Sequence, residues 1–142
     1  MIQVMTGVQS TSAALDAEQT RLEVISQNIA NAHTAHGVDG KPYQRQVVVF
    51  ENALNQAMGA DGNPQAPTLK VASIQKDNSP PIMIFDPGNP DANKQGMVAM
   101  PNINIHEEMA DLISASRTYE ANLAVVKNAR TMANETLSIG KH

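Results

Sequence analysis

Hydrophobic residues recur at heptad spacing near both ends of this chain, and the residues that break helices lie between these two segments. All 8 prolines fall between Pro42 and Pro101. The stretch 102–139 contains neither glycine nor proline, and the first 36 residues contain only Gly7. Because glycine and proline are the strongest local helix breakers, this distribution predicts two long terminal helices of roughly 45 and 50 Å.

The C-terminal segment carries a regular apolar stripe. All positions of this stripe except Ser116 and Arg130 are apolar. Steps of alternately four and three residues give Ile105, Met109, Leu112, Ser116, Tyr119, Leu123, Val126, Arg130, Ala133 and Leu137. Steps that average 3.5 residues keep one narrow stripe facing a partner helix, so we expect the seam of a left-handed coiled coil. The two polar positions either fix the register of the pair or face solvent.

The N-terminal segment shows a thinner version of the same pattern. Its apolar column has a strict spacing of seven and consists of Val8, Leu15, Leu22 and Ile29. Two companion positions, Thr11 and Glu18, are polar. This helix has little apolar surface to bury alone, so we expect it to need neighbours to become ordered.

A second apolar line runs along the C-terminal helix beside the main seam. It consists of Ile113, Val125, Met132 and Ile139. We expect the two terminal helices to pair within one chain, which leaves further sides of the pair open. The second line therefore provides the candidate contacts between subunits.

The middle of the chain is typical of a small β-rich insert. Its apolar residues are β-branched and lie in short runs near 43–51, 68–76, 82–85 and 96–100, separated by turn signals such as Asp39-Gly40. Residues 53–67 resemble a mobile loop. The predicted fold class is α+β, with a discontinuous coiled-coil assembly domain of residues 1–36 and 103–142 and an insert of residues 37–102.

Composition narrows the functional classes. The hydrophobic content of 42% is inflated by alanine, and the chain has no Trp, 2 Tyr and 2 Phe, so one extensive core is not expected. A net charge of -4 offers no basic surface for nucleic acid. No apolar stretch is long enough for a membrane span, and no cleavable signal is expected. The absence of cysteine excludes disulfides and thiolate metal sites.

Motifs of catalysis or cofactor binding are not evident. His33 and His36 with Asp39 have a spacing that a divalent metal could use, but these residues follow the end of a helix, where polar turn residues are common. Residues 91–96 resemble the start of a calcium loop, yet they lack its final glutamate. We therefore expect no enzyme activity, no catalytic residues, no cofactor and no metal, and the metal-dependent hydrolase is a distant alternative.

Five segments resemble the sequence signatures of flagellar rod, hook and related axial proteins. They are SQNIANAHT at 26–34, DGKPYQR at 39–45, DPGNP at 86–90, MPNINI at 100–105 and SASRTYEAN at 114–122. Within the first segment, the matching motif residues are Asn28, Ala30, Asn31 and Thr34. The short insert is most similar to that of proximal-rod members of the family.

The resemblance implies a structural subunit that polymerises through its terminal helices into a tubular drive shaft. The shaft would transmit torque from the motor ring to the distal rod and hook. Implied partners are further copies, other proximal and distal rod proteins, the motor ring, a rod-adaptor protein and, during secretion, the type III export apparatus. The implied location is the basal body, in a rod that spans the periplasm, after export without a cleaved signal. From the residues alone, a stand-alone coiled-coil binding module remains the alternative.

Overall fold

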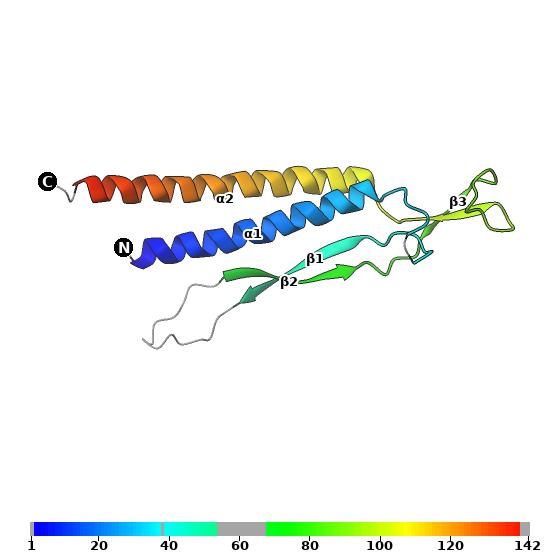
Figure 1. Ribbon diagram of the computed structural model, residues 1–142, viewed down its shortest axis with the longest axis horizontal. Coiled ribbons are helices and arrows are strands. Elements are labelled where there is room, and N and C mark those ends of the chain that lie inside the picture. The colour runs from blue at the N-terminus through cyan, green and yellow to red at the C-terminus, as the bar shows by residue number, and fades with distance from the viewer. Residues whose placement is uncertain (1, 38, 54–67, 140–142) are drawn as a thin grey trace.

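The computed structural model describes residues 2–37, 39–53 and 68–139. Two long helices, α1 (Ile2–Ala30) and α2 (Ile105–Ile139), lie side by side and run in opposite directions, so both chain ends lie at the same end of the molecule (Figure 1). Strands β1 (Gln46–Ala53), β2 (Thr68–Lys76), β3 (Ile82–Phe85) and β4 (Met97–Met100) lie between them in sequence. The predicted α+β fold, with a β insert between terminal helices, is confirmed.

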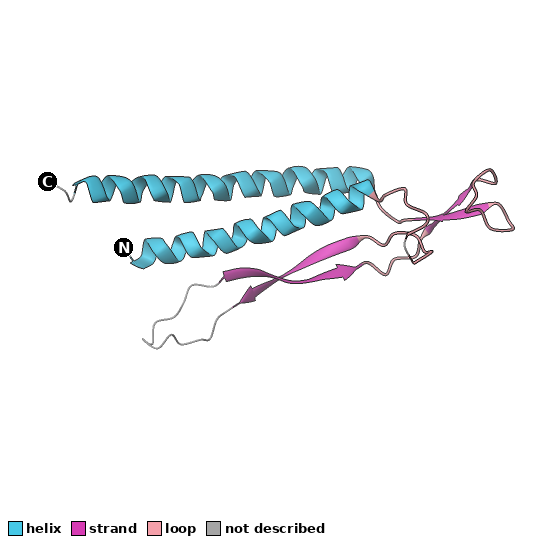
Figure 2. Ribbon diagram, in the orientation of Figure 1, coloured by secondary structure: helices cyan, strands magenta, loops and turns pink. Residues whose placement is uncertain are grey.

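The insert consists of two separate hairpins (Figure 2). Strands β1 and β2 pair antiparallel from Gln46 opposite Lys76 to Ala53 opposite Thr68, with an irregularity between Val49 and Phe50. This hairpin folds back along α1, so α1 lies between α2 and the β1–β2 hairpin. Strands β3 and β4 pair antiparallel and project beyond the end of the helix pair.

Local signals explain where the elements begin and end. The side-chain oxygen of Asn104 accepts a hydrogen bond of 3.1 Å from the backbone N–H of His106, which caps the first turn of α2. Gly40 has a φ of 68°, as the predicted Asp39-Gly40 turn requires. The four strand predictions are confirmed, with β1 beginning at Gln46 instead of residue 43. Of the expected mobile loop at 53–67, residues 54–67 lie outside the described residues.

The core is thin because small side chains make up much of it. Its buried apolar residues are Ala17, Val24, Ile25, Ala32, Val98 and Ala115. Polar residues are buried beside them, namely Glu18, Asn28 and Glu108. Burying polar groups is costly unless they find partners, so the hydrogen bonds of these residues decide how the helices and the insert fit together.

Candidate assembly site

Asn28 lies at the point where α1, β1 and α2 meet, and its side chain is almost fully buried, at 1% exposure. Its Nδ2 donates to the Gln46 carbonyl at 2.9 Å and to Glu108 Oε2 at 3.1 Å. Its Oδ1 accepts from the Gln46 N–H at 2.9 Å and from the Tyr43 hydroxyl at 3.1 Å. The amide thus meets its full hydrogen-bonding capacity and binds both helices to the first strand of the insert.

Glu108 carries the second half of this junction. Its Oε1 accepts a charge-assisted hydrogen bond of 2.6 Å from Arg45 Nε, and its side chain is only 1% exposed. Asp111 lies 3.9 Å from Arg45 and 4.0 Å from Arg21, so looser ion pairs surround the buried bond. A buried carboxylate is stable only when it is paired and hydrogen-bonded, and Glu108 satisfies both conditions here.

Tyr43 closes the network on the insert side, and its ionisation predicts an alkaline limit to stability. Burial raises the pKa of the Tyr43 phenol, and the Glu108 carboxylate adds to the rise. The neutral phenol donates to Asn28, which a phenolate cannot do. The contribution is therefore complete below the ordinary tyrosine pKa of about 10 and is lost as the pH rises through the higher folded value.

We expect the free energy of unfolding of the wild type to fall above about pH 10 more steeply than that of Tyr43→Phe, which has no proton to lose. Urea titrations from pH 8 to 11 measure this difference. Parallel curves for the two proteins would contradict it.

The end of α1 is built by the other motif residues. Asn31 Nδ2 donates to the Gln27 carbonyl at 2.9 Å, and the Thr34 hydroxyl donates to Asn31 Oδ1 at 3.2 Å. The Thr34 carbonyl then accepts from the Tyr43 N–H at 3.1 Å, which directs the chain towards β1. Ala30 is exposed and contributes nothing visible to this turn.

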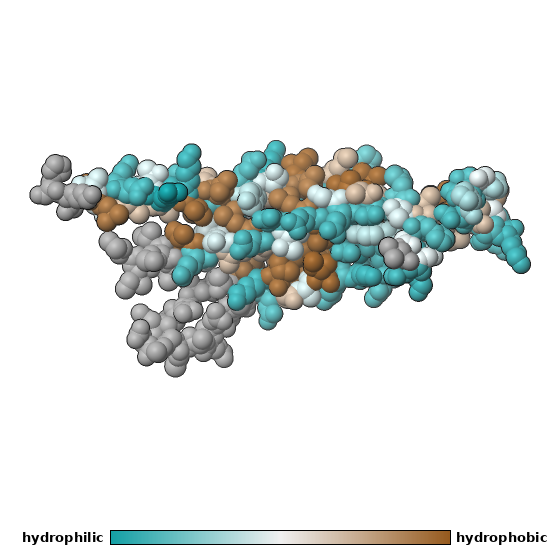
Figure 3. All heavy atoms as spheres, in the orientation of Figure 1, coloured by the Kyte–Doolittle hydropathy of each residue, from teal (hydrophilic) through white to brown (hydrophobic). Residues whose placement is uncertain are grey.

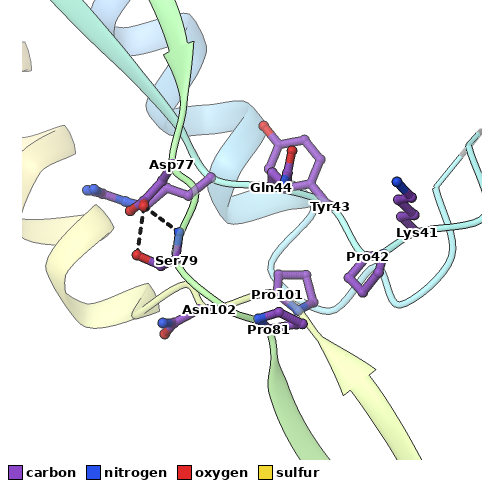
Figure 4. Close-up of a pocket in the computed structure, with 10 residues that line it drawn as sticks. Lys41, Pro42, Tyr43, Gln44, Asp77, Ser79, Pro81, Pro101 and Asn102 are labelled. Atoms are coloured by element: carbon purple, nitrogen blue, oxygen red, sulfur yellow. Dashed lines mark hydrogen bonds between the residues drawn. The ribbon is translucent and has the colours of Figure 1, made fainter.

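Three connecting segments converge beside the junction and enclose a hollow of about 160 Å³ (Figure 4). Pro42, Pro81 and Pro101 line it, one from each connection between the helices and hairpins. Next to it, the Asp77 carboxylate accepts from the Ser79 hydroxyl at 2.6 Å and from its N–H at 2.9 Å. These bonds lower the pKa of Asp77. The hollow marks where the insert is anchored to the helix pair.

The side of α2 that is covered differs in phase from the predicted seam. α2 makes its contacts with α1, so its covered side is the side that faces α1. The buried and half-buried residues on that side include Glu108, Leu112, Ala115, Tyr119, Asn122, Val126 and Ala129. The structure thus places one predicted column, Leu112, Tyr119 and Val126, against α1. Ile105, in the first turn, is half-buried.

The other predicted column of α2 lies beside the covered side and stays largely open to solvent. Met109, Leu123 and Leu137 are 48%, 50% and 60% exposed. The candidate contacts between subunits, Ile113, Val125, Met132 and Ile139, are also exposed. In Figure 3, hydrophobic surface recurs along the helix pair towards the end of α2. The free chain therefore leaves two apolar lines of α2 uncovered.

In α1, the predicted column Val8, Leu15, Leu22 and Ile29 is half-buried throughout. The companion position Glu18 is buried, and its Oε2 has no hydrogen-bond partner. The nearest cation is the Arg21 guanidinium, at 3.9 Å. A carboxylate inside the seam weakens the pairing of the two helices, in agreement with the thin apolar pattern of this segment.

The histidines considered as metal ligands lie on the surface. His33 and His36 are exposed, and His36 Nδ1 lies 3.2 Å from Asp91 Oδ1 in the β3–β4 connection. Within 2–37, 39–53 and 68–139, no three His, Asp or Glu side chains gather closely enough to hold a metal ion. Asn93, in the loop that resembled a calcium site, instead accepts from the N–H groups of Gln95 and Met97 and shapes the turn.

Sequence reasoning missed Arg45 and Glu108 as members of the junction. Arg45 is the last residue of the DGKPYQR segment. Its charge, directly before an apolar strand, was a sequence signal for an ion pair at this position. Glu108 lies with Glu107 in the first turn of α2, where acidic residues are common and usually exposed, so nothing in the sequence marks it as buried.

Among the described residues, neither helix offers a stretch apolar enough to cross a bilayer.

Comparison with known proteins agrees with this architecture. Residues 9–35 match the family model described as "Flagella basal body rod protein", and residues 94–139 match "Flagellar basal body rod FlgEFG protein C-terminal". The flagellar basal-body rod protein FlgC of Borreliella burgdorferi is 38% identical, covering 96% of this chain and 97% of that protein. FlgC of Salmonella typhimurium is 39% identical over 91% and 92%, and FlgC of Bacillus subtilis is 37% identical over 92% and 94%.

The two family models cover the N-terminal helix with its Asn28 turn and the C-terminal helix with its cap, which are the elements that the buried junction joins. Relatives of this similarity span nearly the whole chain in several bacteria. The chain therefore belongs to the FlgC family of flagellar basal-body rod proteins.

Proposed function

We propose that this structural rod subunit polymerises through the uncovered apolar lines of α2 into a tubular drive shaft. The shaft carries torque from the motor ring to the distal rod and hook. Membership of the FlgC family makes the chain a rod component that assembles with other rod components. The residue-level surfaces and the named neighbours are our proposal.

The observation that carries this proposal is the large exposed apolar surface of α2. The exposed residues beyond the first turns are Ile113, Leu123, Val125, Met132, Leu137 and Ile139, at 50% to 76%. Val125, Met132 and Ile139 are spaced by seven and share one side of the helix, and Leu123 and Leu137 share another. Contiguous apolar surface of this kind marks an interaction site, and two separate lines suit a helix with several neighbours.

The buried junction supports the mechanical part of the proposal. Asn28, Glu108 and Arg45 join the two helices and the insert through side-chain bonds of 2.6 to 3.1 Å. A satisfied buried polar network rigidifies the elements that it connects. A subunit built in this way transmits force between neighbours without bending at the root of the insert.

The cellular location of the chain and its specific partners are inferred from family membership and the helix pattern. We place the chain in a periplasm-spanning rod, in contact with the motor ring, a rod-adaptor protein and neighbouring rod proteins. The type III export apparatus would secrete it without a cleaved signal, with the N-terminal part of α1 ordering only on assembly. The interrupted seam of α1, where the buried Glu18 carboxylate has only a loose ion pair with Arg21 at 3.9 Å, supports this late ordering.

We also propose that the chain has no catalytic role. Its buried polar groups Asn28 and Glu108 are used in hydrogen bonds that join elements of the fold. The stand-alone binding module gains no support from the family comparisons, which place the chain among rod proteins. Circular dichroism of the free chain separates the two functions, because a stand-alone module forms both helices in full without partners, whereas the rod subunit gains the N-terminal part of α1 only on assembly.

Electron microscopy of basal bodies from cells that lack this gene tests the proposed function. We expect rods, hooks and filaments to be absent and to return when the wild-type gene is restored, because each later part is built on the rod. Flagella of normal appearance in the deletion strain would contradict the proposal.

A further inference from the structure

Strand β3 carries apolar residues that the free chain covers only in part. Its four residues, Ile82, Met83, Ile84 and Phe85, are 46% to 68% exposed, although Val98, which pairs with Ile84, is buried. Successive residues of a strand point to opposite faces, so both faces of β3 carry half-exposed apolar side chains. A strand that is apolar on both faces is typical of one that is enclosed on both sides.

The hairpin itself supplies little cover. β3 pairs with β4 from Ile82 opposite Met100 to Phe85 opposite Met97, and neither helix packs on this pair. A lone two-stranded hairpin is marginally stable in water. Exposed edge strands usually carry charges that prevent pairing with other chains, and β3 and β4 carry none. The hairpin therefore has the properties of a docking element.

A second uncovered apolar surface lies at the opposite end of the molecule. It is the C-terminal half of α2, where Val125, Met132 and Ile139 form one line and every described residue after Arg130 is exposed. The hairpin projects beyond one end of the helix pair, whereas α2 terminates at the other (Figure 1). One molecule cannot bring these two surfaces together, but two copies arranged head to tail can.

The charges of the two surfaces complement each other. The β3–β4 connection carries Asp86 and Asp91 against the single base Lys94. The described part of α2 beyond Leu123 carries Lys127 and Arg130 against one acid, Glu135. A contact between two hairpins would place like charges together, whereas a contact between hairpin and α2 joins opposite charges.

We propose that the β3–β4 hairpin of one copy docks on the C-terminal half of α2 of a second copy, in a head-to-tail contact. This inference rests on the proposed rod assembly and names one of its contacts. The contact joins two different patches, so each pair of copies keeps one hairpin and one α2 surface free for further subunits, and repetition of the contact builds a ring or an open helical filament. That geometry suits a polymer.

Thiol cross-linking between differently tagged copies tests this contact, because the chain has no cysteine of its own. One copy carries Met83→Cys and the other Met132→Cys, and both are expressed together in the deletion strain. Purified basal bodies are treated with a short bismaleimide. We expect a cross-linked species that contains both tags. The matched control replaces Met132→Cys by Asn134→Cys, which is also exposed but lies two residues later and so about 160° away around α2, and the product is expected to be lost.

Three results overturn the inference in cells that still build rods. The first is a cross-link between two Met83→Cys copies. The second is a cross-link from Met83→Cys to a different rod protein, and the third is the absence of any cross-link between the Met83→Cys and Met132→Cys copies. Rods are present in each of these cases, so the proposed rod function would still stand. Only flagella of normal appearance in the deletion strain would contradict that function. If Met83→Cys fails to restore motility, Ile84→Cys on the opposite face of the strand takes its place.

Discussion

Leu123→Asp is expected to abolish rod assembly while leaving the free subunit folded. Leu123 is 50% exposed in the free chain and belongs to the predicted column of α2 that stays largely open beside α1. An exposed substitution of this kind changes stability by no more than about 0.5 kcal/mol. In a rod, the same carboxylate would be buried against a neighbouring subunit, at a cost of several kcal/mol per contact.

The measurement has two parts, electron microscopy of basal bodies from complemented cells and circular dichroism of the purified variant. Thr131→Asp is the matched control, because Thr131 is exposed and its neighbours one turn away, Lys127, Asn128, Asn134 and Glu135, are polar. It adds the same charge outside both apolar lines and should leave rods intact. Normal rods with Leu123→Asp would exclude Leu123 from the assembly surface. Loss of helix in the free variant would instead give Leu123 a role in the fold.

Asn28→Ala is expected to destabilise the free subunit by about 3 to 5 kcal/mol, because it leaves several buried partners unsatisfied at once. The N–H and carbonyl of Gln46, the Tyr43 hydroxyl and Glu108 Oε2 all lose a hydrogen-bond partner. The core of this chain is thin, so no neighbouring apolar contact compensates for these lost hydrogen bonds. Urea unfolding followed by circular dichroism measures the change.

Two further variants make this test specific. Gln27→Ala, at an exposed position one residue earlier, should change stability by no more than about 0.5 kcal/mol. Asn28→Asp keeps the shape but places a second carboxylate where Nδ2 now lies 3.1 Å from Glu108 Oε2. It should be as damaging as Asn28→Ala at neutral pH and should partly recover in acid, where the new carboxyl takes up a proton. Equal stability of Asn28→Ala and wild type would mean that the junction does not hold the fold.

The junction also explains why Asn28 belongs to the motif that identified the family resemblance. A heptad pattern alone would place an apolar residue near the end of α1. Asparagine is required because its amide imitates a backbone unit and pairs with both the N–H and the carbonyl of Gln46. The side chain thus begins β1 at Gln46, three residues later than the β-branched pattern predicted.

Local signals in the sequence specify the secondary structure and the family of this protein. The absence of glycine and proline from 102–139 predicts α2, and turn residues separate the four strands. These signals are local, because they depend on backbone preferences of neighbouring residues. For the same reason the five motif segments could be recognised without any knowledge of their contacts.

Which side of α2 faces α1 depends on contacts between distant residues. A shift of one residue turns a helix by about 100°, and the columns that begin at Glu108 and at Met109 differ by that amount. Spacing alone predicts a seam of the Met109 and Leu112 columns, whereas the structure covers the Glu108 and Leu112 columns. The buried bond of Glu108 to Asn28 and Arg45 fixes the opposite choice, since an unpaired buried carboxylate would cost more than a few exposed apolar residues. Long-range polar pairing of this kind leaves no periodic trace in a sequence, and it is what keeps the apolar column of Leu123 free for other subunits.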